Sequence, residues 1–68
     1  MINIRRDTII RKGDILLSEN RDDRWEVKEM VGMKIYVINP KSKSEKIMFK
    51  EDLILNNWSL IVNGRGYW

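Results

Sequence analysis

The sequence predicts a small all-β domain, and three observations support this class. Isoleucine, valine and aromatic residues dominate the apolar positions, apolar and polar residues alternate in several short runs, and alanine, which helices favour, is absent. A chain of 68 residues is long enough for one domain. We expect this domain at residues 1–62, with its core within 8–62, and a C-terminal tail at 63–68.

Five short strands are expected. An extended segment at residues 8–11 precedes them, and the strand-forming runs lie at 14–18, 25–31, 34–39, 45–49 and 58–62. The connections are rich in turn-forming residues and lie at Lys12-Gly13-Asp14, 19–24, Gly32-Met33 and 40–44. Residues 50–55 do not alternate. They predict a single turn of 3₁₀ or α-helix before the last strand, ended by Asn56-Asn57.

Alternation along these runs indicates which side chains form the core. Trp25 shares one face of its strand with Val27, and Ile47 faces the same way as Phe49. Trp58 begins the last strand in register with aliphatic residues. We therefore expect four large side chains in the core or at its edge: Trp25, Val27, Phe49 and Trp58.

Two further positions follow from the same pattern. Tyr36 lies on the opposite face from Ile35 and Val37, so we expect it to be half exposed, with contact to a ligand as the less favoured alternative. The pair Met30-Val31 breaks the alternation of its strand, which indicates a bulge or the end of the strand.

The order of elements resembles a known small fold. The segments that carry the resemblance are Lys12-Gly13-Asp14-Ile15-Leu16, Arg24-Trp25-Glu26-Val27, Gly32-Met33-Lys34-Ile35-Tyr36-Val37, Phe49-Lys50-Glu51-Asp52-Leu53 and Trp58-Ser59-Leu60-Ile61. Over residues 8–62 the chain resembles the SH3-like small barrel, including its KOW and Tudor variants. The resemblance implies a five-stranded SH3-like barrel, closed so that strand edges are hidden, with one helical turn before the last strand. It also implies a binding role, because this fold hosts nucleic-acid binders, peptide binders and histone-tail readers.

The composition argues against an enzyme. The chain has neither cysteine nor histidine, so it lacks a thiol nucleophile, an imidazole base and the usual zinc ligands. Glu19, Asp22 and Asp23 share one loop, but their spacing does not match a calcium-binding loop, and a solvated loop explains them. We expect no catalytic residues, no cofactor and no metal.

Positive charge is concentrated in two blocks. Thirteen Lys and Arg against ten Asp and Glu give a net charge of +3. Residues 1–12 and residues 41–50 each carry a net charge of +3, whereas 13–40 carry −2. The first block contains Arg5, Arg6, Arg11 and Lys12, and the second contains Lys41, Lys43 and Lys46. Such residues suit phosphate contacts, but lysines also protect exposed sheet edges, so both interpretations stay open.

The C-terminal tail holds a third group of candidates. Arg65, Tyr67 and Trp68 lie where chains usually fray. The two aromatic side chains either cap an open end of the barrel or are exposed anchors. Exposed, they would stack on unpaired bases or fill a pocket of a partner.

The sequence thus predicts a small non-enzymatic binding module that contacts nucleic acid or an acidic protein surface through its basic residues. The alternative is an inhibitor or adaptor that blocks a host or defence protein, of the anti-restriction or anti-CRISPR type, through an aromatic and basic patch. Ten isoleucines, seven lysines and six asparagines reflect AT-rich codons, which favours a phage or mobile-element origin. No apolar run approaches the length of a membrane span or a signal peptide, so we expect a cytoplasmic protein without membrane contact.

Overall fold

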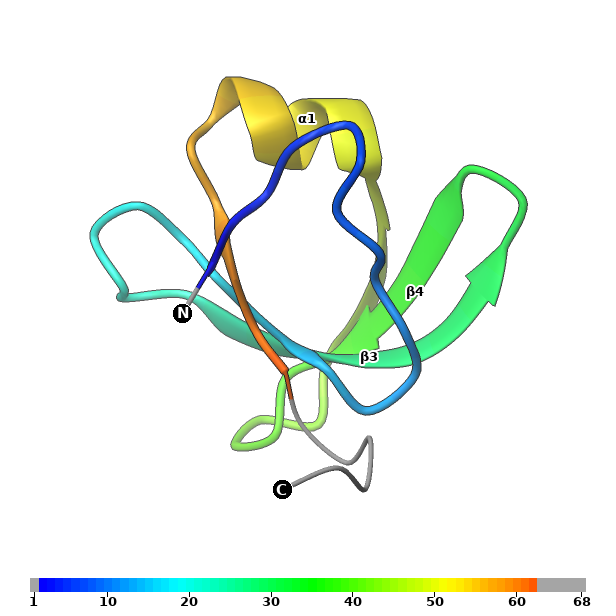
Figure 1. Ribbon diagram of the computed structural model, residues 1–68. Coiled ribbons are helices and arrows are strands. Elements are labelled where there is room, and N and C mark those ends of the chain that lie inside the picture. The colour runs from blue at the N-terminus through cyan, green and yellow to red at the C-terminus, as the bar shows by residue number, and fades with distance from the viewer. Residues whose placement is uncertain (1, 63–68) are drawn as a thin grey trace.

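The computed structural model describes residues 2–62, which form a mostly-β domain with one short helix (Figure 1). The elements in chain order are β1 (Ile2–Asn3), β2 (Ile15–Leu17), β3 (Arg24–Val31), β4 (Lys34–Ile38), β5 (Glu45–Phe49), α1 (Lys50–Leu55) and β6 (Ser59–Ile61). The strands pair antiparallel in a single six-stranded sheet, in the spatial order β1-β6-β2-β3-β4-β5. The five expected strands and the helical turn are confirmed to within about one residue at each end.

The sheet differs from the expected closed five-stranded barrel in two ways. It has a sixth strand, β1, which pairs with β6 through Ile2 opposite Leu60 and Asn3 opposite Ser59. The sheet is also not closed, because β1 and β5 are its two edges within the described residues. The helix α1 lies between β5 and β6 in the chain, and β6 pairs with β2 and β1 instead of β5.

The expected extended segment at 8–11 does not join the sheet. It belongs to the connection from β1 to β2, which Figure 1 shows crossing in front of the sheet near α1. Ile10 is buried within it and joins the core cluster. Burial of Ile10 and hydrogen bonds to Thr8 and Arg11 hold this segment in place, without a ladder of strand hydrogen bonds.

The long strand β3 contains a bulge. Its pairing with β4 shifts register between Val27 and Glu29, and the strand then continues to Val31. The expected bulge therefore occurs slightly earlier than Met30-Val31, where the strand ends. Because the bulge adds one residue, Val27 and Met30 both lie opposite inward-facing residues of β4, namely Val37 and Ile35.

The core lies on the concave side of the sheet. Leu16, Val27, Ile35, Val37 and Leu60 are all essentially inaccessible to solvent, and they come from four different strands. Leu53 of α1 covers one end of this cluster. Trp25 and Trp58 are half buried and pack against it, as expected for side chains at the edge of the core.

Phe49 is not a core residue, and this expectation was wrong. The pairing of β4 with β5 places Met48 opposite the buried Ile35, and Met48 is buried with it. Because side chains alternate between the faces of a strand, Ile47 and Phe49 then face outward, and both are exposed. Tyr36, opposite Ile47, is half buried as expected.

Two leucines of contrasting burial provide a test of the core. Leu16→Ala should lower the free energy of unfolding by about 2–5 kcal/mol, because it removes buried methyl groups and leaves a cavity. Leu55→Ala, at an exposed position of α1, should change it by less than about 0.5 kcal/mol. Urea unfolding followed by circular dichroism measures both values. Equal destabilisation by the two substitutions would contradict the core described above.

Candidate functional site

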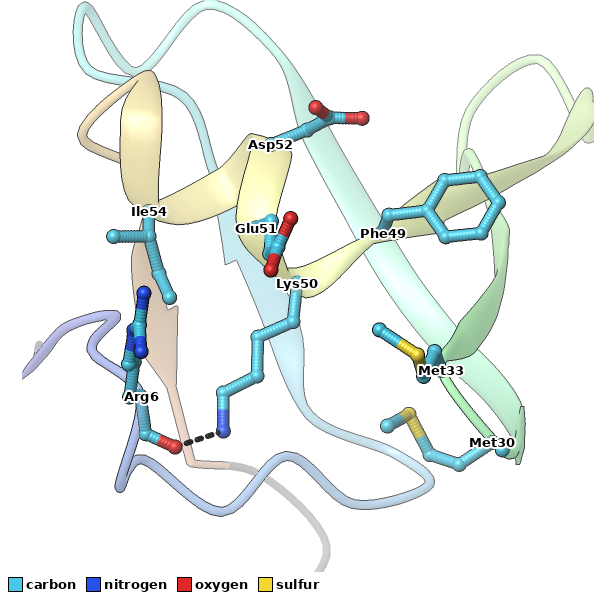
Figure 2. Close-up of a pocket in the computed structure, with 9 residues that line it drawn as sticks. Arg6, Met30, Met33, Phe49, Lys50, Glu51, Asp52 and Ile54 are labelled. Carbon is cyan, nitrogen blue, oxygen red and sulfur yellow. Dashed lines mark hydrogen bonds between the residues drawn. The ribbon is translucent and has the colours of Figure 1, made fainter.

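A cleft of about 550 Å³ lies between the tip of the β3–β4 hairpin and α1. Met30 and Met33 line it from the hairpin, and Ile54 lines it from α1 (Figure 2). We call it the methionine cleft. Phe49 lies at the junction of β5 and α1, and Arg6 lies on the wall opposite the methionines. The size is within the usual range of ligand-binding pockets, and most of the lining is apolar.

Exposed apolar side chains are concentrated on the β3–β4 hairpin and β5, and three of them, Met30, Met33 and Phe49, line this cleft. Of the eight large hydrophobic residues exposed among residues 2–62, five belong to the hairpin or to β5: Met30, Val31, Met33, Ile47 and Phe49. Met33 is the most open of these five, with 74% of its surface accessible. We call these five residues the apolar surface. A gathering of this kind on a small domain is typical of an interaction site.

The turn of the hairpin explains why Met33 is exposed. Gly32 and Met33 connect β3 to β4 directly, and Gly32 has φ of +60°, a conformation that glycine adopts without steric cost. The expected tight reversal is thereby confirmed. A two-residue turn holds Met33 at the outermost point of the hairpin, where the body of the sheet does not cover it. Flexible thioether side chains at such a place adapt to differently shaped partners.

Lys50 holds the opposite wall of the cleft. Its Nζ donates a hydrogen bond of 2.7 Å to the carbonyl oxygen of Arg6, drawn in Figure 2, and another to the carbonyl oxygen of Thr8. The same segment is closed by a turn in which the amide of Arg5 donates to Thr8 Oγ1 at 2.8 Å. The Lys50 ammonium therefore fastens the β1–β2 connection to the start of α1, and this contact positions Arg6 beside the cleft.

Charges of both signs border the cleft. The Arg6 guanidinium lies on one side, and the carboxylates of Glu51 and Asp52 lie in the first turn of α1. Figure 2 shows the Asp52 carboxylate directed away from the two methionines. The cleft thus offers apolar contact at its centre and charged groups at its rim, as protein-binding surfaces commonly do.

The first basic block is exposed, but its four members do not lie together. Arg5 and Arg6 lie in the turn near α1, and Arg5 borders a shallow hollow with Ile2 and Asp7, separate from the methionine cleft. Lys12 lies in the turn before β2, beside Glu26, Glu29 and other residues of the outer sheet face. Arg11 is exposed, and its backbone amide donates to the buried Asp14 carboxylate at 3.0 Å.

The turn at 39–44, which holds two lysines of the second basic block, lies far from Arg5 and Arg6. Figure 1 shows the 39–44 turn, which carries Lys41 and Lys43, at the opposite end of the molecule from α1. Asn39 Oδ1 orders this turn by accepting hydrogen bonds from the amides of Lys41 and Ser42, at 2.9 and 3.1 Å. The structure therefore brings Lys50 of the second block beside Arg6 but leaves the 39–44 turn at the other end of the molecule.

Lys46 has a role within the domain. Its Nζ lies 4.4 Å from the centre of the Trp25 ring, a cation–π contact that contributes about 0.5–1 kcal/mol at an exposed site. Lys28 and Glu45 form an ion pair at 3.5 Å, the one ion pair within residues 2–62. The remaining predicted site residues, Arg65, Tyr67 and Trp68, lie outside the described residues.

The described residues contain no group of three or more acidic, histidine or cysteine side chains positioned to hold a metal ion. They also contain no helix long and apolar enough to cross a membrane. Comparisons of the chain with protein-family models, with curated proteins and with solved structures found no match. The candidate site therefore stands on its geometry alone.

The methionine cleft does not follow from the sequence patterns. Met33 was assigned only to a turn, and Phe49 was assigned to the core. One signal was available, because a methionine in a two-residue turn has no neighbouring side chains to cover it. The partners of Lys50 were not predictable, because the hydrogen bonds to Arg6 and Thr8 join residues more than forty positions apart.

Removal of the Lys50 ammonium tests its structural role. Lys50→Met should lower the free energy of unfolding by about 1–3 kcal/mol, because two backbone carbonyls lose a charged hydrogen-bond donor. Lys41→Met, in the exposed 39–44 turn, is the matched control and should have little effect. Thermal unfolding measures stability, and amide hydrogen exchange at residues 5–9 reports on the segment itself. Unchanged exchange in Lys50→Met would show that the contact does not hold this segment.

Proposed function

We propose that this protein is a non-enzymatic binding module whose partner is another protein, held at the methionine cleft. The observation that carries the proposal is that three exposed apolar side chains, Met30, Met33 and Phe49, line one cleft on a domain whose basic residues are dispersed. It corresponds to the inhibitor or adaptor interpretation of the sequence. The contact surface differs from the expected aromatic and basic patch, since methionines and Phe49 provide it with Arg6 at the rim.

We further infer that the domain is a variant of the SH3-like small barrel. The spatial order β6-β2-β3-β4-β5, with a helical turn between β5 and β6, supports this assignment. In this variant, α1 spans the seam between β5 and β6, where no strand pairing occurs in the described residues. The cleft then lies at one end of that seam, between the hairpin tip and α1.

The distribution of charge also favours a protein partner over nucleic acid. A polyanion needs several cations along one continuous surface. Here Lys46 contacts Trp25, Lys28 pairs with Glu45, and Lys50 contacts two carbonyls. Glu26 and Glu29 lie on the outer sheet face, close to Lys12. A partner with a bulky apolar side chain and neighbouring charges suits the cleft better.

The four methionines provide a direct test of the proposal. Peptides selected by display against the full chain should carry bulky apolar anchors, and their binding should shift the methyl resonances of Met30 and Met33 in spectra of methionine-labelled protein. Met48, which is buried on the concave face, is the internal control and should shift little. Met33→Lys should weaken binding at least tenfold with an unchanged melting temperature, because it places an ammonium group in an apolar contact. Selected peptides that leave Met30 and Met33 unshifted would contradict the proposal.

Nucleic acid is the second candidate, because the side chains of Arg5, Arg6 and Arg11 are exposed and form no ion pair within residues 2–62. If these arginines contact phosphates, the logarithm of affinity should fall with the logarithm of salt concentration, and replacing all three with Ala should reduce that slope by up to about three. Replacing Lys41 and Lys43 tests the other end of the molecule. Absence of binding to single- and double-stranded DNA and RNA at about 50 mM salt, where such contacts are strongest, would eliminate this candidate.

A further inference from the structure

The two edges of the sheet are very different. The β1 edge is a strand of only two residues, Ile2–Asn3. The β5 edge is a strand of five residues, Glu45–Phe49, which pairs with β4 on one side and with no other strand of the described residues on its second side. An unpaired edge offers a row of backbone donors and acceptors that another strand can complete. The β5 edge is therefore the place where this sheet is open to extension.

The side chains of β5 make its edge receptive to an apolar strand. Ile47 is 45% exposed, and it extends the outer-face row in which Glu29 lies opposite Tyr36 and Tyr36 lies opposite Ile47. The three residues Ile47, Met48 and Phe49 carry no charge. Natural sheets usually guard an edge of this length with charged side chains, and here only its first two residues, Glu45 and Lys46, are charged.

Those two charges indicate which strand fits. Glu45 is already paired with Lys28 at 3.5 Å. Lys46 borders a hollow beside β5 that is also lined by Met48, by Asp52 of α1 and by Trp58. An apolar strand would leave the Lys46 ammonium, which already lies over the Trp25 ring, without an anionic partner. A partner strand would complement Lys46 if an acidic residue followed that strand in the way that Asp52 follows β5.

We propose that the β5 edge pairs with the β5 edge of a second copy of this chain, antiparallel and centred on Ile47. This register sets Ile47 directly opposite its own symmetry mate and Lys46 opposite Met48 of the second copy. Because Asp52 and Met48 line the same hollow, Asp52 of the second copy then lies toward Lys46, and two-fold symmetry repeats that contact. The strand and the helical turn that follows it are thus complementary in charge to the same segment of a second copy. Phe49 and Asp52 also line the methionine cleft. The dimer does not require a partner protein in that cleft, however, so its test is independent of the proposed function.

The oligomeric state of the full chain tests the proposal. Sedimentation equilibrium from about 1 μM to about 1 mM, which spans weak to tight association, should reveal a reversible species of twice the 8.2 kDa chain mass. Ile47→Lys should raise the dimer dissociation constant at least tenfold, because it sets two ammonium groups directly opposite each other. Ile2→Lys is the matched control, since Ile2 lies on the other edge and is 49% exposed, and it should leave the constant unchanged.

Reversal of charge tests the register. Lys46→Glu and Asp52→Lys should each weaken the dimer, because each sets like charges together, and the double variant should restore it. Circular dichroism confirms that each variant is folded, which matters for Lys46→Glu because it also removes the contact with Trp25. A monomer at every concentration would overturn the proposal. A dimer that Ile47→Lys and Ile2→Lys weaken equally, or that the double variant does not restore, would overturn it as well.

Discussion

Burial of one small apolar cluster is the constraint on which the rest of this structure depends. The chain has no cysteine, so no disulfide supplements the core. Leu16, Val27, Ile35, Val37 and Leu60 are packed on the concave side of a curved sheet, with α1 over one end, as Figure 1 shows. A domain this small has little stability to lose, so every strand must present the correct face to this cluster.

The same constraint shapes the surface of the molecule. Because Met48 must lie opposite Ile35, its neighbours Ile47 and Phe49 are directed outward. Because the β3 bulge adds a residue, Met30 faces the concave side of the sheet near the tip of the β3–β4 hairpin. It lies next to the exposed turn that holds Met33. The apolar surface is therefore a consequence of how the core is registered. The part of the hairpin that extends beyond the core provides the cleft.

The positive charge of the chain has several structural uses. Lys50 secures the β1–β2 connection, and Lys46 packs on Trp25. Only part of the net charge therefore remains for a ligand, and that part is divided between the two ends of the molecule. A net charge describes long-range attraction, whereas a binding site requires charges that lie side by side. This difference is why the apolar cleft supports a function more directly than the basic blocks do.

Local patterns in the sequence are sufficient to predict the class of the domain, the places of most strands and the position of α1. The run of β-branched and aromatic residues at 35–38, glycine at the Gly32-Met33 turn and the non-alternating run at 50–55 are local signals, and local backbone preferences decide such features. The sequence did not determine which face of β5 is buried. Ile47, Met48 and Phe49 are three apolar residues in a row, so their pattern does not show which alternate positions face the core. Only the pairing with β4 settled that question.

The tertiary structure also decided the pairing of β1, the open sheet and the bridge from Lys50 to Arg6 and Thr8. Each of these joins segments that are distant in the chain, and a strand of two residues has no periodicity to detect. The candidate site has the same origin, because Arg6, Met33 and Ile54 come from three separate segments. Local patterns specify which elements form, whereas the packing of the common core determines which residues meet at the surface.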